Sequence, residues 1–298
     1  MASPELLDEI RAGLSRRQKA LPPKFFYDQR GSELFEEITK QPEYYPTRTE
    51  RALLERWAPE WVAELRPHTV LELGAGSARK TRVILEAMRG VTGGGLFVPV
   101  DISGDFLEET AEAIRAEYPE IEVEPVVADI GVRMKLPTEL PRPVLFVFLG
   151  STLGNFPARD AVALLSRVCE ATRPGDRLLL GVDLRKDRTR LEAAYNDARG
   201  VTAEFNRNML RVLNAETGAD FDPDAFEHQA RYHPRLHRIE MHLAAKSPQR
   251  VHVPGAGDFR FREGETLRTE ISCKYDRDSV RRLLKAAGMR LARWETDE

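Results

Sequence analysis

The sequence predicts an α/β protein with a doubly wound, mostly parallel sheet, interrupted by an inserted α+β lobe. Residues 69–81 (TVLELGAGSARKT) join a short apolar run to a helical pattern through a glycine turn. Apolar runs and helical patterns then alternate as far as residue 183, which is typical of a parallel sheet with right-handed crossovers. After residue 183 this alternation stops, and residues 235–275 predict strands joined by turns.

The composition narrows the class of protein. A chain of 298 residues can form one large or two modest globular domains. A net charge of −3 without a long basic run argues against a nucleic-acid partner. Cys169 and Cys273 are too few for a disulfide framework and lack metal-site spacing. No apolar run has membrane-spanning length, and residues 1–20 carry both charge signs, so we expect a cytoplasmic protein with no membrane partner.

The segment before the first sheet strand is rich in aromatic residues. We expect a surface helix over residues 5–19, a break at residues 21–23 and a helix over residues 49–64. Between them lie six aromatic residues: Phe25, Phe26, Tyr27, Phe35, Tyr44 and Tyr45. Such a group suits either a small core or the wall of a pocket, and by itself it favours a core.

The elements of the sheet follow in order. We expect strands at residues 70–73, 96–101, 123–129, 144–149 and 177–183, and helices from residue 80, over residues 105–118 and over residues 158–172. Helices are expected over residues 187–231 and 279–287, and a last strand over residues 291–294. We therefore place one domain at residues 1–47 plus 186–273, and the sheet domain at residues 48–185 plus 274–298.

Ligands of doubly wound sheets bind beyond the carboxyl ends of the strands. Four such ends carry polar residues or glycine: Gly74, Asp101, Asp129 and Gly150. Asp101 suits a ribose and Asp129 the amine of adenine, although either could instead cap a helix. Lys80 could meet a ligand carboxylate, but a lone lysine is more often solvated. Arg79 stands where the dinucleotide fingerprint has its third glycine, which disfavours a nicotinamide-dependent oxidoreductase.

Two further groups of residues could carry chemistry. Residues 150–155 (GSTLGN) resemble a nucleophile elbow, but Thr152 occupies the central position and no histidine lies in a plausible partner region. A turn that presents backbone groups and the Asn155 amide to a second ligand is the better interpretation. Glu270 and Ser272 share one face of a predicted strand and could bind an imidazole, although the pair taken alone favours an exposed strand face.

Histidines are concentrated late in the chain. Five of the six lie between residues 228 and 252, namely His228, His233, His237, His242 and His252. Pro234 interrupts this extended segment and no cysteine joins it, so we disfavour a metal site.

From about residue 14 to residue 297 the chain resembles the S-adenosylmethionine-dependent histidine Nα-methyltransferases of ergothioneine biosynthesis. The strings that carry the resemblance are LPPKFFYD, GSELFEEIT, PEYYPTRTE, ELGAGSARKTR, FLGSTLGN, GVTAEFNRN, DFDPDAFEH, RIEMHL and TEISCKY. The glycine motif alone would indicate only a methyltransferase. The resemblance implies a Rossmann-like class I methyltransferase sheet with a substrate-binding insertion.

The resemblance also implies roles for individual residues. The S-adenosyl-L-methionine cofactor would be bound by Gly74 in the glycine turn, by Lys80 at its carboxylate and by Asp101 at its ribose. Asp129 and the backbone of Ile130 would bind adenine. Relatives often have phenylalanine in place of Ile130. The substrate L-histidine would be bound through its carboxylate by Tyr44, Asn155 and Tyr195, and through its imidazole by Glu270 and Ser272, with Met241 closing that pocket. The space around the α-amine would be lined by Tyr27, Phe35, Gly150 and Thr152, with Asn155 also near the amine.

The expected reaction is in-line transfer of up to three methyl groups to that amine, giving Nα,Nα,Nα-trimethylhistidine (hercynine), by a monomer that needs no metal. The alternatives are a family member that acts on another amino acid and a non-catalytic module that binds S-adenosylmethionine. Family members normally continue with one more strand beside the fifth, so the end at Glu298 implies either a truncation or altered strand pairing at that edge.

Overall fold

The computed structural model describes residues 2–131, 137 and 139–297. The chain forms two compact units, each made of two separate stretches. Unit 1 comprises Met1–Tyr44 and Lys186–Ser272, and unit 2 comprises Tyr45–Arg185 and Cys273–Glu298. The chain therefore passes between the units three times.

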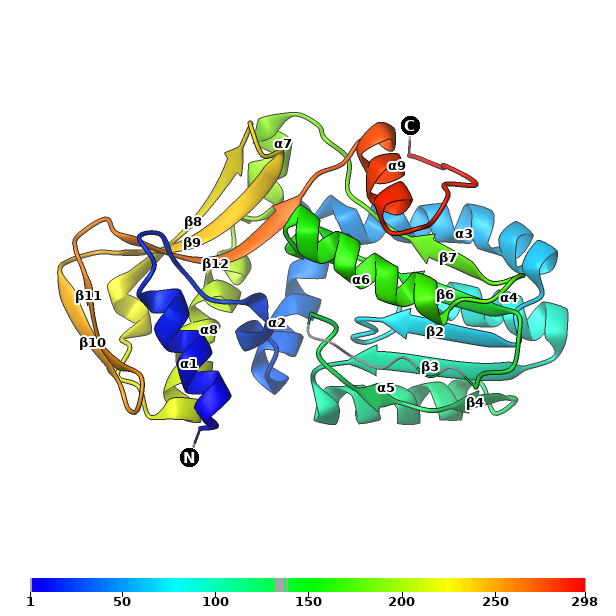
Figure 1. Ribbon diagram of the computed structural model, residues 1–298, viewed down its shortest axis with the longest axis horizontal. Coiled ribbons are helices and arrows are strands. Elements are labelled where there is room, and N and C mark those ends of the chain that lie inside the picture. Colours follow the sequence, from blue (N-terminus) through cyan, green and yellow to red (C-terminus); the bar gives the residue numbers. More distant parts are fainter. Residues whose placement is uncertain (1, 132–136, 138, 298) are drawn as a thin grey trace. The chain divides into compact units, whose positions relative to one another are not determined.

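Unit 2 is built on a parallel sheet (Figure 1). Its strands in spatial order are β4 (Ile121–Val123), β3 (Gly95–Asp101), β2 (Thr69–Leu73), β6 (Val144–Phe148) and β7 (Arg177–Leu180), with β5 (Val126–Val127) also paired to β3. Its helices are α3 (Tyr45–Leu65), α4 (Arg82–Thr92), α5 (Gly104–Glu117), α6 (Ala158–Ala171) and α9 (Arg277–Ala286). The order reverses direction at β2, so the predicted doubly wound parallel sheet is confirmed.

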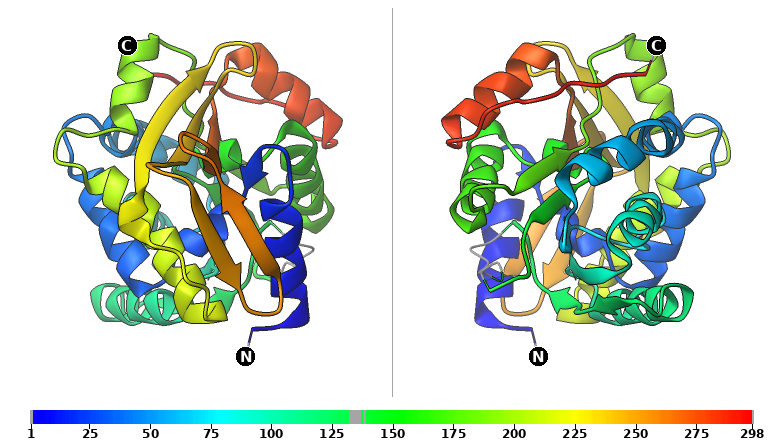
Figure 2. Two further views of the ribbon diagram at one scale, coloured as in Figure 1. Left: turned by 90° about the vertical axis from the view of Figure 1, so that its left-hand side faces the viewer. Right: turned by 90° about the vertical axis from the view of Figure 1, so that its right-hand side faces the viewer.

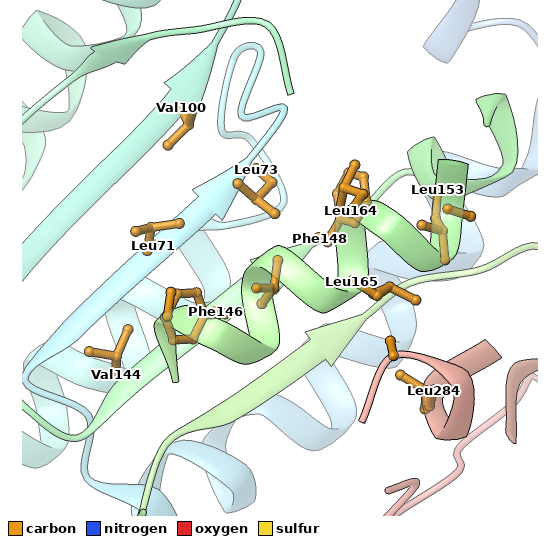
Figure 3. Packing of buried hydrophobic residues seen from close by; sticks show 14 of the residues in the cluster. Leu71, Leu73, Val100, Val144, Phe146, Phe148, Leu153, Leu164, Leu165 and Leu284 are labelled. Atoms are coloured by element: carbon orange, nitrogen blue, oxygen red, sulfur yellow. The ribbon is translucent and has the colours of Figure 1, made fainter. Parts of the chain in front are cut away.

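Both faces of this sheet are covered by helices, which explains why its central strands are apolar throughout. Leu71 and Phe146 point to the face packed by α6 and α9, where Leu165 and Leu284 meet them (Figure 3). Val70 on β2 points to the opposite face, which is covered by α3, α4 and α5. Because strand side chains alternate between faces, each central strand contributes to both apolar layers.

Unit 1 combines helices with strands, most of them yellow and orange in Figure 2, that include two antiparallel pairs and one parallel pair, the latter between its first and last strands. Its four-stranded sheet has the order β1 (Lys19–Ala20), β12 (Thr266–Cys273), β9 (Arg238–Ala245) and β8 (Phe226–His233), and β10 (Gln249–Val253) pairs with β11 (Gly257–Phe261). Its helices are α1 (Pro4–Leu14), η1 (Pro23–Phe26), α2 (Gln29–Thr39), α7 (Arg188–Ala194), α8 (Val201–Thr217) and η3 (Pro223–Ala225). The buried face of α8 includes Phe205, Met209 and Leu213.

Three expectations about elements were wrong. The helical region predicted to reach residue 231 ends at Thr217, because Gly218 adopts a left-handed φ of 71° and closes α8, and β8 begins at Phe226. The strand predicted over residues 123–129 is divided into β4 and β5. Pro125 lies between these strands and has no N–H to donate to the ladder.

The last strand, predicted over residues 291–294, is not formed. Leu291 and Trp294 pack against the apolar layer beneath α9, while Arg293 pairs with Glu60 and Glu64 on α3. The alternation of apolar and polar residues in this segment therefore reflects packing on an apolar layer on one side and ion pairs with α3 on the other. It does not reflect hydrogen bonding of the backbone to a neighbouring strand. Among the described residues, no helix has the length and apolar character needed to cross a membrane.

Candidate functional site

The glycine turn after β2 presents backbone N–H groups beside a carboxylate. The N–H groups of Gly74 and Ala75 donate to the carbonyl of Val100 on the neighbouring strand, at 2.8 and 3.1 Å. The N–H of Gly76 donates to Asp101 Oδ2 at 2.9 Å, and that of Ser103 donates to Asp101 Oδ1 at 3.1 Å. Two backbone donors thus orient the Asp101 carboxylate at the end of β3, and each of its oxygens keeps further lone pairs for a ligand.

Both glycines of this turn have conformations that favour glycine, with φ of 68° at Gly74 and 51° at Gly76. A Cβ atom on Gly74 would lie 3.8 Å from Thr152 Cγ2 and 3.9 Å from Ile130 Cδ1. The structure therefore brings three predicted site residues together from three separate loops. A Cβ on Gly76 would meet no atom within 4 Å, so backbone and ligand can approach each other there.

Asp129 follows β5 at the same edge of the sheet. Its Oδ1 accepts a hydrogen bond from the N–H of Gly131 at 2.7 Å, so one oxygen stabilises the local turn. The carbonyl of Ile130 accepts from the Arg167 guanidinium at 2.9 Å. The carbonyl of Ile130 is thus held by α6.

Lys80 does not lie in open solvent. Its ammonium pairs with the carboxylate of Glu50 on α3, and the two side chains are only 19% and 15% exposed. Glu50 also accepts from the N–H of Gly150, at 3.0 and 2.9 Å for its two oxygens. A side chain at Gly181 would overlap Glu50 Oε1, so the glycine makes room for this carboxylate. Glu50 therefore links Lys80 to the start of the loop after β6, through an ion pair on one side and hydrogen bonds to Gly150 on the other.

The loop after β6 has a strained start and a short 3-10 helix. Gly150 has a φ of 74°, and Ser151 has a φ of 56°, which is unusual for a residue with a side chain. The helix η2 (Thr152–Asn155) follows, and the Thr152 hydroxyl donates to the carbonyl of Leu149 at 2.9 Å. Asn155 is half-buried and is the last residue of this short helix, which is stabilised by hydrogen bonds within the loop.

Unit 1 brings the predicted aromatic site residues into one group. Tyr27, Phe35, Tyr44 and Tyr195 form a chain of edge-to-face contacts, with centroid separations of 6.3, 6.1 and 6.1 Å in that order. Phe205 on α8 contacts both Tyr27 and Phe35, at 5.8 and 6.1 Å. We call these five residues the aromatic group. Their ring faces and the hydroxyls of the tyrosines are suited to an amine or carboxylate that carries little water.

The aromatic group connects directly to the predicted imidazole site. The Tyr195 hydroxyl donates to Ser272 Oγ at 2.8 Å, and Ser272 is 3% exposed. Glu270 lies two residues earlier on β12 and shares the strand face of Ser272, as predicted. Met241 is buried on β9, where its carbonyl accepts from the Thr269 hydroxyl at 3.2 Å.

The residues of unit 2 fit a nucleoside cofactor that carries a carboxylate. The glycine turn leaves open space at Gly76 in which a ligand can approach the protein backbone. The Asp101 carboxylate can accept hydrogen bonds from the two hydroxyls of a ribose, and the Lys80 ammonium supplies a positive charge for a ligand carboxylate. Within the described ranges, no three histidine, cysteine or acidic side chains are grouped so that they could hold a metal ion.

Comparison with known proteins gives the family. Residues 6–298 match the model of the family described as "Histidine-specific methyltransferase, SAM-dependent". The chain belongs to this family. The cofactor of this family is S-adenosylmethionine, which is a nucleoside that carries a carboxylate.

Individual relatives agree with this assignment. The chain is 47% identical over 97% of its length to "Histidine N-alpha-methyltransferase" of Mycobacterium tuberculosis, 90% of which is covered. It is 46% identical over 99% of its length to the protein of the same name from Mycolicibacterium smegmatis, covering 92% of it. "Ergothioneine biosynthesis protein 1" of Neurospora crassa is 29% identical over 91% of the chain, which spans about a third (31%) of that longer protein.

Sequence reasoning missed Glu50 and Phe205 in this family member. Both lie inside strings that carried the resemblance, PEYYPTRTE and GVTAEFNRN, but helical periodicity alone gave them no role. Glu50 contacts a residue 30 positions away, and Phe205 contacts residues about 170 positions away. Only the fold brings these pairs together.

Proposed function

We propose that this methyltransferase transfers methyl groups from S-adenosylmethionine to the α-amine of L-histidine. Three successive transfers give Nα,Nα,Nα-trimethylhistidine (hercynine), a step of ergothioneine biosynthesis. Family membership supports the reaction class, and the names of the relatives support the substrate and the pathway. The observation that carries the proposal is the aromatic group of unit 1, whose Tyr195 is hydrogen-bonded to Ser272.

The cofactor supplies an activated methyl group on a sulfonium, so the protein mainly has to bind and align the reactants. In this proposal the Asp101 carboxylate accepts hydrogen bonds from the ribose hydroxyls, and Asp129 with the backbone of Ile130 binds adenine. Gly74 allows close approach of the cofactor, and Lys80 binds its carboxylate. Glu50 holds the Lys80 ammonium in place through its own bond to Gly150.

The substrate amine must be neutral to attack the methyl carbon. Tyr27 and Phe35 line the space around it together with Gly150 and Thr152, and they exclude the water that stabilises the ammonium form. As methyl groups are added, the nitrogen becomes permanently charged, and the ring faces of Tyr27 and Phe35 attract that charge. The same rings therefore favour both the first and the last transfer.

The remaining groups select the amino acid. Tyr44 and Tyr195 supply hydroxyls for the carboxylate, and the Asn155 amide binds the carboxylate and the amine. Glu270 accepts from an imidazole N–H and Ser272 completes the pair, while the side chain of Met241 closes the pocket. A carboxylate beside a hydroxyl can satisfy both ring nitrogens, which an indole cannot match because it has a single N–H and no acceptor nitrogen.

The test combines turnover with binding. The protein is mixed with S-adenosylmethionine and L-histidine, and mono-, di- and trimethylated products are followed by mass spectrometry. Calorimetry with L-histidine in the presence of S-adenosylhomocysteine then compares the wild type with Glu270→Ala. We expect the variant to lose about 1–3 kcal/mol of histidine affinity, because a hydrogen bond to a charged group is lost.

Other outcomes identify the alternatives. Methylation of tryptophan or another amino acid in preference to histidine would indicate a different substrate within the family. Cofactor binding without any methylated product would indicate a binding module. We also propose that the protein acts as a monomer in the cytoplasm, which sedimentation of the purified protein and fractionation of the producing cells would test.

A further inference from the structure

His228 on β8 has a fixed hydrogen-bonding role that the proposed reaction does not use. Its Nδ1 lies 2.8 Å from the amide nitrogen of Asn206, and its Nε2 lies 2.8 Å from the carbonyl oxygen of Tyr195. An amide nitrogen can only donate and a carbonyl oxygen can only accept. The two partners therefore select the neutral imidazole with its proton on Nε2.

The orientation of the Asn206 amide is itself fixed. Asn206 is completely buried on α8, and its amide nitrogen also lies 3.0 Å from the carbonyl oxygen of His242 on β9. A flipped amide would place its oxygen against that carbonyl oxygen, so only the present orientation leaves both contacts favourable. The donor that faces His228 is therefore oriented by α8, which carries Asn206, and by the His242 carbonyl on β9.

The carbonyl that His228 holds belongs to Tyr195, which is the residue at the end of α7. The side chain of Tyr195 makes two of the contacts that define the proposed substrate site, the hydroxyl bond to Ser272 and the ring contact with Tyr44. Three hydrogen bonds therefore link Asn206, His228, Tyr195 and Ser272, and they reach Tyr195 at its backbone carbonyl and leave it at its side-chain hydroxyl.

We propose that His228 is a positioning residue for substrate recognition, acting through the backbone of Tyr195. This inference rests on the proposed function. The neutral ring holds the Tyr195 carbonyl and thereby sets the direction of the Tyr195 hydroxyl. Protonation of Nδ1 would place a donor against the Asn206 donor and break this arrangement, so substrate binding should weaken in acid.

The electrostatic surroundings agree with a neutral ring. Burial lowers the pKa of His228, and the charges of Arg207 on α8 and His242 on β9 act in the same direction. The bond to the Tyr195 carbonyl and the carboxylate of Asp197, between α7 and α8, oppose them. The balance keeps the imidazole uncharged at neutral pH.

The experiment compares His228→Gln with His228→Leu. Glutamine offers an oxygen for Asn206 and an N–H for the Tyr195 carbonyl but does not titrate, whereas leucine offers neither. We expect His228→Leu to raise the KM and the Kd for histidine about tenfold, the effect of losing one or two hydrogen bonds. His228→Gln should stay within about threefold of wild type at pH 8. Affinity for S-adenosylhomocysteine should be unchanged in both.

A pH series separates positioning from a merely structural role. The ratio of the wild-type KM to the His228→Gln KM should rise as the pH falls from 8 to 5.5, because only the wild type carries the titrating ring. Ionisation of the substrate cancels in this ratio. In a Tyr195→Phe background, His228→Leu should cause little further loss, since the hydroxyl it positions is already absent.

Two results would overturn the inference: equal effects of the glutamine and leucine variants, or a ratio that does not change with pH. If His228→Leu does not fold, the inference is still tested by how the ratio of the wild-type KM to the His228→Gln KM changes with pH. Wild-type protein that binds S-adenosylhomocysteine but not histidine would overturn the proposed function and this inference together. Normal histidine binding by His228→Leu would overturn this inference alone.

Discussion

The ammonium of Lys274 lies 2.9 Å from Asp183 Oδ2, and the Tyr45 hydroxyl donates to the same oxygen at 2.8 Å. The Lys274 side chain is completely buried and that of Asp183 is 5% exposed. All three residues belong to unit 2, and each lies within three residues of a point where the chain passes to unit 1. The N–H of Asp183 also donates to Ser151 Oγ at 2.9 Å, in the loop that carries Thr152 and Asn155.

Breaking this buried pair should destabilise the protein strongly. Lys274→Met removes a positive charge that lies beside the buried Asp183 carboxylate, which we expect to lower the free energy of unfolding by about 3–5 kcal/mol. Adding Asp183→Asn should recover part of this loss, because the amide oxygen can still accept from Tyr45. Urea unfolding measures both, and Arg281→Met, which breaks an exposed pair with Asp278, should cost at most about 1 kcal/mol. Equal losses in the single and double variants would contradict this account.

The stability of the protein should fall as the pH rises, because of Glu72. This carboxyl lies in β2, two residues before Gly74, and burial raises its pKa from 4.5 to about 8. Between these values the folded protein binds a proton that the unfolded chain has lost, so stability is full below pH 4.5 and is lost towards pH 8.

Glu72→Gln removes this linkage. We compare the free energy of unfolding of the variant with that of the wild type at each pH. The difference, variant minus wild type, should rise between pH 4.5 and pH 8 by up to about 1.4 kcal/mol per pH unit. Urea unfolding at pH 5, 6, 7 and 8 measures it, with Glu122→Gln, at the exposed position of β4, as the matched control. A constant difference between the Glu72 variant and wild type would show that this buried carboxyl is not the source of the linkage.

Phe35 should matter most for the later methylation steps. Its ring contacts Tyr27, Tyr44 and Phe205, and in the proposed function it faces a nitrogen that becomes more cationic. Phe35→Ala should weaken binding of dimethylated histidine by about 1–2 kcal/mol, measured by calorimetry with S-adenosylhomocysteine present. Phe221→Ala is the control, because Phe221 packs in a different aromatic cluster with Phe226 and Phe261. Unchanged affinity in Phe35→Ala would remove the cation–π argument.

Cofactor affinity should depend on the charge of Lys80 but not on the charge of Glu50. Lys80→Met should weaken S-adenosylhomocysteine binding by about 2 kcal/mol, since a charge-assisted contact to the ligand carboxylate is lost. Glu50→Gln keeps an oxygen that can accept from Lys80 and from the Gly150 N–H but removes the negative charge that competes with the ligand carboxylate, so affinity should not fall. Titration calorimetry checks both, and parallel losses in the two variants would mean that Lys80 serves Glu50 rather than the ligand.

Local patterns were enough to predict much of unit 2. The apolar runs of β2, β3 and β6 are buried on both faces, so their hydrophobicity identified them without any knowledge of the partners. The positions of Gly74 and Asp101 at strand ends followed from the topology alone, because parallel strands end at one edge. These predictions needed only the period and the order of the elements.

The wrong element predictions and the site residues that were missed share one cause. In each case the outcome depends on contacts with residues far away in the sequence. The strand expected over residues 291–294 depended on a ladder partner, and the side chains there found an apolar layer and Glu60 instead. His228 belonged to a run of histidines considered only for metal binding, while its role depends on Asn206, 22 residues away. A strand period shows which face a side chain occupies but not what it meets there.

The cluster of Tyr45, Asp183 and Lys274 gathers all three chain crossings at one place in unit 2. A chimera that joins unit 2 of this protein to unit 1 of another family member would need three splice sites, and placing each of them on the unit 1 side of these residues keeps the cluster intact. A cut that transfers only one of Lys274 and Asp183 would separate this buried pair, whereas cuts that leave both residues in unit 2 would preserve it. Because the chain crosses between the units beside these three residues, a single buried cluster of unit 2 decides whether unit 1 can be exchanged without loss of stability.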